Sequence, residues 1–328
     1  MDIEFHYYIT FILARKAGFN ANQSYKIAYS SQYTDNNNFR YFINFDDGSH
    51  YLNEISQTLD ITKPSQKRQK IYPLFHFIPG GVESSNKNQF KGKSYHDFTT
   101  IPDSPNAQKL FDAALKSKNL YQTGIAAHAY ADTWAHQNFL GYKHKFNGKK
   151  GFEKIIPNIG HADFMHEPDK VHNKWKDERL KKRYNEIDND QRFLEAAKAI
   201  YIRFWKHNHA KADDKKAEDK YNRIGLENDL RKAMDETYFW GSDDKARIKA
   251  YKEICEELDQ NNYKYDPKAW RYKAVEKKDF ETDLFDRYWA KTNFKRSYWY
   301  KFQEAVKWYR GEAIKVLKPL YKKVGLPI

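Results

Sequence analysis

Three polar side chains recur at a spacing of four residues between positions 128 and 136: His128, Asp132 and His136. A helix turns by about 100° per residue, so steps of four keep all three within an arc of roughly 80°. The positions between them are mainly apolar, which predicts that the stripe is buried. Buried histidine and aspartate side chains need partners, and either a hydrogen-bonded ladder or a metal site would provide them.

The spacing of this stripe favours more than one metal ion. His128 and His136 are separated by about 12 Å of helix rise, whereas zinc–ligand bonds are about 2 Å long. One ion therefore does not join the two histidines easily. Asp132 lies between them and carries two carboxylate oxygens, so the pattern predicts two or more ions with Asp132 shared between them.

Other segments hold residues that could complete such a site. The stretch from 161 to 169 contains five ionisable residues: His161, Asp163, His166, Glu167 and Asp169. Three further candidates stand singly, among aromatic residues or near a helix end: His6, Asp35 and His76. A histidine with apolar neighbours is more often a hydrogen-bonded core residue. Here, however, the stripe at 128–136 already requires partners, which favours metal binding.

This set of residues resembles the zinc-dependent phospholipase C and single-strand nuclease superfamily. The resemblance covers about residues 1–170 and is carried by His6, Tyr33-Thr34-Asp35-Asn36, Phe75-His76-Phe77, the motif His128-x3-Asp132-x3-His136, and His161. It implies a helical fold that holds three zinc ions in a cleft, in a bacterial branch of that superfamily.

The resemblance implies a ligand set for each ion. One zinc ion would be held by Asp35, His76, His128 and Asp132. Another would be held by His6, Asp132 and the chain N-terminus. The N-terminus does not look like the processed one of the secreted enzymes. This role therefore falls on Met1, or Asp2 substitutes for it, or the third site is absent, so either two or three zinc ions are expected.

The remaining ion would be held by His136, His161 and one more residue. In the superfamily this last ligand usually follows the histidine by four residues, but that position is a methionine in this chain. The resemblance then leaves Asp163, His166 or Glu167 for the role, and we favour Asp163.

This ligand set predicts hydrolysis of a phosphoester. Clustered divalent ions lower the pKa of bound water and stabilise the attacking and leaving oxygens. A phosphodiester reacts through a more negative transition state, which nearby cations stabilise more than the ground state. Asp35, or alternatively Glu4, could accept a proton from the attacking water. Calcium fits poorly because the set is rich in histidine.

We therefore expect a zinc-dependent phosphoesterase, with a phosphodiester as the preferred substrate. Nucleic acid, nucleotides and phospholipid headgroups are all compatible with it. The alternative is a non-enzymatic protein that binds nucleic acid or another partner through its basic surface and uses zinc structurally. An open coordination position would favour the enzyme, and closed sites with four protein ligands would favour the binder.

Composition supports a folded, basic protein. The 328 residues include 58 Lys and Arg against 44 Asp and Glu, a formal net charge of +14 that favours polyanionic partners. Aromatic residues make up 17%, far more than disordered chains contain. The single cysteine, Cys255, excludes internal disulfides and cysteine-based zinc knuckles. Neither a signal peptide nor a transmembrane stretch is visible, so we expect a cytoplasmic protein.

The elements that position these residues are predicted to be mainly α-helical. Helices are expected at 5–17, from about 22 to the polar run at 34–38, at 106–118 and at 120–139, with a β-hairpin at 39–55 and loops over 60–106. From Pro168 onward the pattern is almost wholly helical. We expect one helical domain over 1–328. Residues 1–170 form its metal-site half, and 171–328 form a half rich in aromatic residues and lysine, without a recognised motif.

Overall fold

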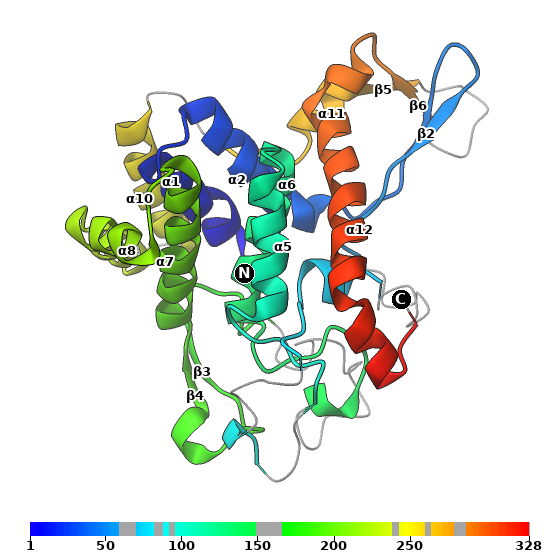
Figure 1. Ribbon diagram of the computed structural model, residues 1–328. Helices are drawn as coiled ribbons and strands as arrows, with labels where there is room; N and C mark the ends of the chain where they lie inside the picture. The colour runs from blue at the N-terminus through cyan, green and yellow to red at the C-terminus, as the bar shows by residue number, and fades with distance from the viewer. Residues whose placement is uncertain are drawn as a thin grey trace.

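A computed structural model describes residues 1–58, 70–81, 88–91, 96–148, 166–237, 243–259, 264–278 and 287–327. The predicted fold class is confirmed, since helices dominate and the strands are few and short (Figure 1). None of the helices within these ranges combines the length and the apolar character that crossing a membrane requires.

The N-terminal helices follow the prediction, with one local difference. The chain begins with a π-helix, η1 (Glu4–Ile9), which continues into α1 (Thr10–Lys16). Next comes α2 (Ala21–Asn36), whose first turn is closed by a capping box between Asn20 and Gln23. The wide π-turn was not predicted from the sequence. It carries His6, and π-turns are frequent at functional sites.

Helix α6 (Leu120–Ala135) lies against α2 and supplies the polar stripe. The two helices approach closely at Gly124, where a Cβ atom would lie only 2.3 Å from the Ile27 carbonyl oxygen. The predicted end of the helix at 139 is wrong, because it ends at Ala135 and His136 is its C-cap. Two neighbouring helices are α4 (Tyr72–Phe75) and α5 (Pro105–Lys116).

The remaining helices lie in the second half of the chain, apart from η3. They are η3 (Lys145–Asn147), η5 (Lys182–Tyr184), α7 (Asn189–Asn208), α8 (Asp214–Arg223), α9 (Leu226–Met234), α10 (Asp243–Leu258), α11 (Ala269–Ala274), η6 (Phe294–Arg296) and α12 (Tyr298–Val324). The prediction that this half is almost wholly helical is wrong at four short strands. These are β3 (Lys174–Lys176), β4 (Glu186–Asp188), β5 (Val275–Lys278) and β6 (Arg287–Ala290).

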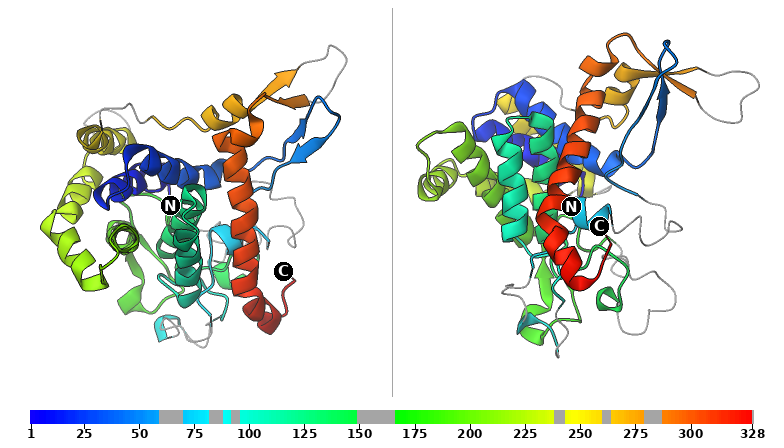
Figure 2. Two further views of the ribbon diagram at one scale, coloured as in Figure 1. Left: turned by 45° about the horizontal axis from the view of Figure 1, so that its top comes forward. Right: turned by 45° about the vertical axis from the view of Figure 1, so that its right-hand side comes forward.

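The predicted hairpin is present as β1 (Phe42–Asn44) and β2 (His50–Leu52), an antiparallel pair. It does not stand alone, because β6 pairs with β1 in parallel and β5 pairs with β6, giving a four-stranded sheet in the order β2-β1-β6-β5. Figure 2 shows this sheet projecting from the helical body, with the blue hairpin beside the orange strands. A second, two-stranded sheet joins β3 and β4.

One apolar core contains residues from both halves of the chain. The ring of Phe5 in η1 packs on Phe193 in α7, with centroids 5.8 Å apart. Tyr29 in α2 stacks on Trp270 in α11 at 3.8 Å. The elements that carry His6 and Asp35 are therefore held by aromatic packing against α7 and α11.

Candidate metal centre

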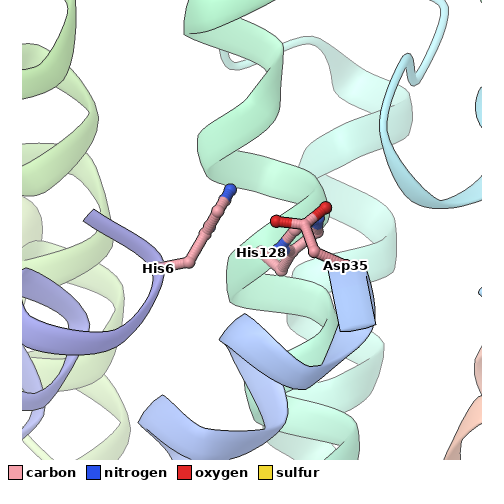
Figure 3. Close-up of side chains that lie close together, drawn as sticks. All are labelled: His6, Asp35 and His128. Carbon is pink, nitrogen blue, oxygen red and sulfur yellow. The ribbon is translucent and has the colours of Figure 1, made fainter. Parts of the chain in front are cut away.

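Side chains from three separate elements converge on the polar stripe of α6. Figure 3 shows His6 from η1 and Asp35 from the last turn of α2 directed toward His128. The rings of His6 and His128 stack with their centroids 3.8 Å apart. His6, Asp35 and His128 each offer a donor atom within 4.8 Å of the others.

Four donor atoms form a first set around Asp132 Oδ2. His128 Nε2 lies 3.0 Å from His76 Nδ1, and these nitrogens lie 3.3 and 3.2 Å from Asp132 Oδ2. Asp35 Oδ1 lies 3.7 Å from each of the two nitrogens. Donors bound tetrahedrally at the zinc distance of 2.0–2.1 Å stand about 3.3 Å apart. The spacing of this set therefore fits one zinc ion.

The other oxygen of Asp132 faces a second group of donors. Asp132 Oδ1 accepts a hydrogen bond of 2.6 Å from the α-amino group of Met1 and lies 3.1 Å from His6 Nε2. The same amino group lies 3.1 Å from Asp169 Oδ1, which in turn lies 2.9 Å from His136 Nε2. The two oxygens of Asp132 thus face different donor sets, as a bridging carboxylate would.

Two of the histidines have their ring orientation fixed by backbone carbonyl groups. His76 Nε2 lies 2.9 Å from the Ser56 carbonyl oxygen, and His136 Nδ1 lies 2.8 Å from that of His76. A carbonyl only accepts, so these nitrogens carry the protons. The opposite nitrogens are left with lone pairs directed at Asp132 and Asp169, as in many metal-ligating histidines.

The burial and the charges of the surrounding groups favour cation binding at the centre. Burial lowers the pKa of His6 to about 3 and also lowers that of His136, so both rings are neutral at pH 7. Burial would raise the pKa of Asp132, but the Met1 ammonium group and nearby histidines hold it well below its usual range. Against the effect of burial, the surrounding carboxylates raise the pKa of the Met1 amine to about 11 and raise that of His76. The pocket is therefore anionic in character.

The structure brings together six of the residues that the sequence singled out: His6, Asp35, His76, His128, Asp132 and His136. His161 and Asp163 lie outside the described residues. Of the alternatives to Asp163, His166 is exposed and Glu167 accepts a hydrogen bond from Asn173 at 2.8 Å.

Asp169 is the functional candidate that sequence reasoning did not select. It lies beside His136 and the Met1 amine, at the end of the acidic segment in which the last ligand was sought. Its position in this acidic segment is the sequence feature that could have identified it. The superfamily spacing, which places the last ligand four residues after His161, does not select position 169.

The alternative base, Glu4, is engaged elsewhere. Its carboxylate receives hydrogen bonds from Arg247 Nε at 2.9 Å and from Arg247 Nη2 at 2.9 Å, and both side chains are buried. Both of its oxygens are thus occupied by the guanidinium group, although burial raises the pKa of Glu4 above its usual value. Of the two predicted bases, the geometry favours Asp35.

Residues 1–317, which span the helices from η1 through most of α12, match the model of a family of unknown function, DUF6765. No curated protein matches the chain, and no solved structure matches it. Since the match takes in nearly the whole sequence, including both donor sets, the chain belongs to the family of unknown function DUF6765.

Proposed function

We propose that the protein is a zinc-dependent hydrolase that cleaves a phosphoester, with a phosphodiester as the preferred substrate. The observation that carries the proposal is the geometry of Asp132, which offers one oxygen to a zinc-sized set of donors and the other to a second set. The resemblance of the same residues to the zinc-dependent phospholipase C and nuclease superfamily supports it.

The chemistry of the donors fits zinc. Four imidazole rings and three carboxylates face the centre: His6, His76, His128, His136, Asp35, Asp132 and Asp169. Mixed imidazole and carboxylate sets suit zinc, whereas calcium and magnesium take oxygen ligands. When bound, zinc ions would lower the pKa of a bound water and offset the negative charge that develops on a phosphodiester.

The exposure of the side chains distinguishes the buried donors from the groups that solvent and substrate can reach. Asp132 and His128 are at most 1% exposed and hold the floor of the centre, whereas the side chains of Asp35 and Asp169 are 26% and 20% exposed. The open side of the centre is therefore lined by these two carboxylates. Asp35 is the group we assign to orient a water molecule and accept its proton.

The basic surface suits an anionic substrate. With 58 basic against 44 acidic residues, the chain attracts polyanions from solution. Inside the centre, three carboxylates would repel such a substrate, so metal ions are needed to reverse the local charge. The proposal thus predicts that substrate binding depends on metal.

One observation favours a second candidate. The first donor set already contains four protein ligands, and closed sets of four are typical of structural zinc. In that case the protein is a basic nucleic-acid or partner-binding protein whose zinc stabilises the fold. The partial exposure of Asp35 favours the enzyme, because this ligand can be reached from solvent.

The test is hydrolysis by zinc-loaded protein of a chromogenic phosphodiester, single-stranded DNA and RNA, and phosphatidylcholine. We expect turnover of at least one substrate, loss of turnover on chelation, and a fall of orders of magnitude in Asp132→Asn. His209→Ala is the control, because His209 stacks on Trp205 and has no part in the centre. Absence of turnover on the whole panel, by protein with full zinc content, would favour the structural role.

A further inference from the structure

The exposed large apolar side chains of the described residues lie together on one part of the molecule. They are Phe39, Phe42, Leu52 and Tyr272, which are 58%, 52%, 46% and 51% exposed. All belong to the projecting arm, which we define as residues 39–52, 269–278 and 287–290 (Figure 2). They form two groups, since Phe42 is paired with Leu52 in register, whereas Phe39 and Tyr272 lie near the Tyr41 ring and the Arg271 side chain. Groups of exposed apolar side chains mark interaction surfaces.

The register of the sheet separates a covered face from an open one. Ile43 and Val275 are buried, and Tyr51 packs against Trp299 of α12, so one face lies on the helical body. Residues paired in register share a face, as do residues two apart along a strand. Phe42, Leu52, His50, Trp289 and Lys278 therefore share the opposite face.

Rings and cations alternate on this arm. On the open face, Phe42 stacks on His50 at 4.5 Å, and Lys278 Nζ lies 5.3 Å from the centre of the Trp289 ring. Lys278 Nζ also pairs with the exposed Glu276 carboxylate at 3.2 Å. On the other side of the sheet, the Arg271 guanidinium group lies 4.8 Å from the rings of both Tyr41 and Tyr272, and Tyr41 packs on Tyr288, which shares the face of Ile43. Phe39 extends this second cluster by packing on Tyr41 at 4.8 Å.

Further cations stand at the base of the arm. Lys273 and Arg296 are exposed and line one hollow together with the Tyr298 ring, over which Lys26 Nζ lies at 5.0 Å. Within the described part of the chain, neither Lys273 nor Arg296 forms an ion pair with a carboxylate. These groups remain available to an anionic partner, in keeping with the positive charge of the whole chain.

We propose that the arm binds single-stranded nucleic acid, with bases stacked on its exposed rings and phosphates held by the neighbouring lysine and arginine side chains. Four-stranded sheets with surface aromatic residues bind RNA by stacking its bases, and stacking is largely independent of sequence. The arm lies outside the metal centre, so this binding goes beyond the proposed hydrolysis and does not depend on it.

The arrangement of the apolar side chains favours this partner over a membrane or a duplex. The apolar groups are flat rings spread over the two sides of the sheet, interleaved with cations, rather than a wedge at the tip. In a duplex the bases are stacked on one another, so their faces are not accessible to such rings.

The test is fluorescence anisotropy with labelled 12-nucleotide oligothymidylate and oligouridylate, and with a duplex of the same length. It is carried out on the wild type and on the Asp132→Asn chain, so that cleavage does not remove the probe. We expect tighter binding to the single strands than to the duplex in both proteins. Phe42→Ala and Arg271→Ala should each weaken single-strand binding about tenfold.

Two substitutions away from the arm serve as matched controls. Tyr184→Ala removes a half-buried ring and Lys232→Ala removes an exposed cation, and both should bind as the wild type does. Unchanged thermal unfolding of Phe42→Ala would show that the half-exposed ring is not needed for folding. Equal affinity of Phe42→Ala and the wild type would overturn the proposal. Equal affinity for duplex and single strand would overturn it too, as would Phe42-dependent binding to phosphatidylglycerol vesicles without oligonucleotide binding.

Discussion

Asp132→Asn gives the sharpest test of the metal centre, because one carboxylate faces both donor sets. Its Oδ2 lies 3.2 and 3.3 Å from the nitrogens of His76 and His128. Its Oδ1 lies 2.6 Å from the Met1 amine and 3.1 Å from His6 Nε2. The amide of asparagine has nearly the same shape, so packing should persist while two oxygen ligands lose their charge.

The size of the effect follows from the share that one ligand contributes. Zinc sites with four protein ligands bind the ion with a free energy of about 10–16 kcal/mol, so each ligand contributes roughly 3–4 kcal/mol. Loss of one ligand from each set should therefore raise each dissociation constant by about 10²- to 10³-fold. Asp132→Asn is expected to lose both metals under conditions in which the wild type holds them.

Two further variants separate the donor sets. His76 belongs to the first set, so His76→Ala should lose the first metal only. Asp169 contacts the Met1 amine and His136, which belong to the second set, so Asp169→Asn should lose the second metal only. Elemental analysis after dialysis against buffered zinc gives the stoichiometry. Full retention of both metals by Asp132→Asn would refute the bridging assignment, and so would a wild type with no transition metal.

Four other outcomes are expected from the same structure. Chelation should lower the melting temperature by several degrees, since the ligands come from separate segments; an unchanged melting curve would place the metals outside the fold. Gly124→Ala should destabilise the protein by about 1–3 kcal/mol through its clash with α2, whereas Gly311→Ala, with nothing within 4 Å, should stabilise it by up to about 1 kcal/mol in denaturant titrations. Arg247→Met should cost about 3–5 kcal/mol by leaving the buried Glu4 carboxylate unpaired, and a loss below about 1 kcal/mol would contradict a buried pair. Because burial lowers the pKa of His6 from 6.5 to about 3, the unfolded chain binds a proton that the native metal-free chain does not. Protonation of the unfolded chain therefore lowers the free energy of unfolding progressively as the pH falls from 6.5 toward 3, and has little effect above pH 6.5. His6→Gln removes this contribution, so its free energy of unfolding should depend less on pH.

Local patterns in the sequence were sufficient to predict the polar stripe. Helical spacing placed His128 and Asp132 on one face of α6, and both are buried as expected. The same rule extended the helix too far, because the end of a helix depends on capping and on tertiary contacts as well as on periodicity. His136 follows the last helical residue, and its ring is held by the carbonyl group of His76.

Local sequence patterns of this kind do not predict contacts between distant segments. Asp169 meets His136 across 33 positions, and no periodicity links the two. Strand β5 contains Val275, Glu276, Lys277 and Lys278, which lack the alternation of apolar and polar residues that predicts a half-buried strand. Its pairing with β6, and the pairing of β6 with β1 from the first fifth of the chain, supply the stability that its own sequence does not.

The π-turn at the start of the chain connects the fold to the chemistry of the centre. A π-turn holds one more residue than an α-helical turn and thereby changes the direction of its side chains. In η1 this turn brings His6 to within 3.1 Å of Asp132 and stacks it on His128. Glu4 begins the turn and is tied to α10 by Arg247. This ion pair therefore ties the π-turn that carries His6 of the metal centre to a helix of the C-terminal half.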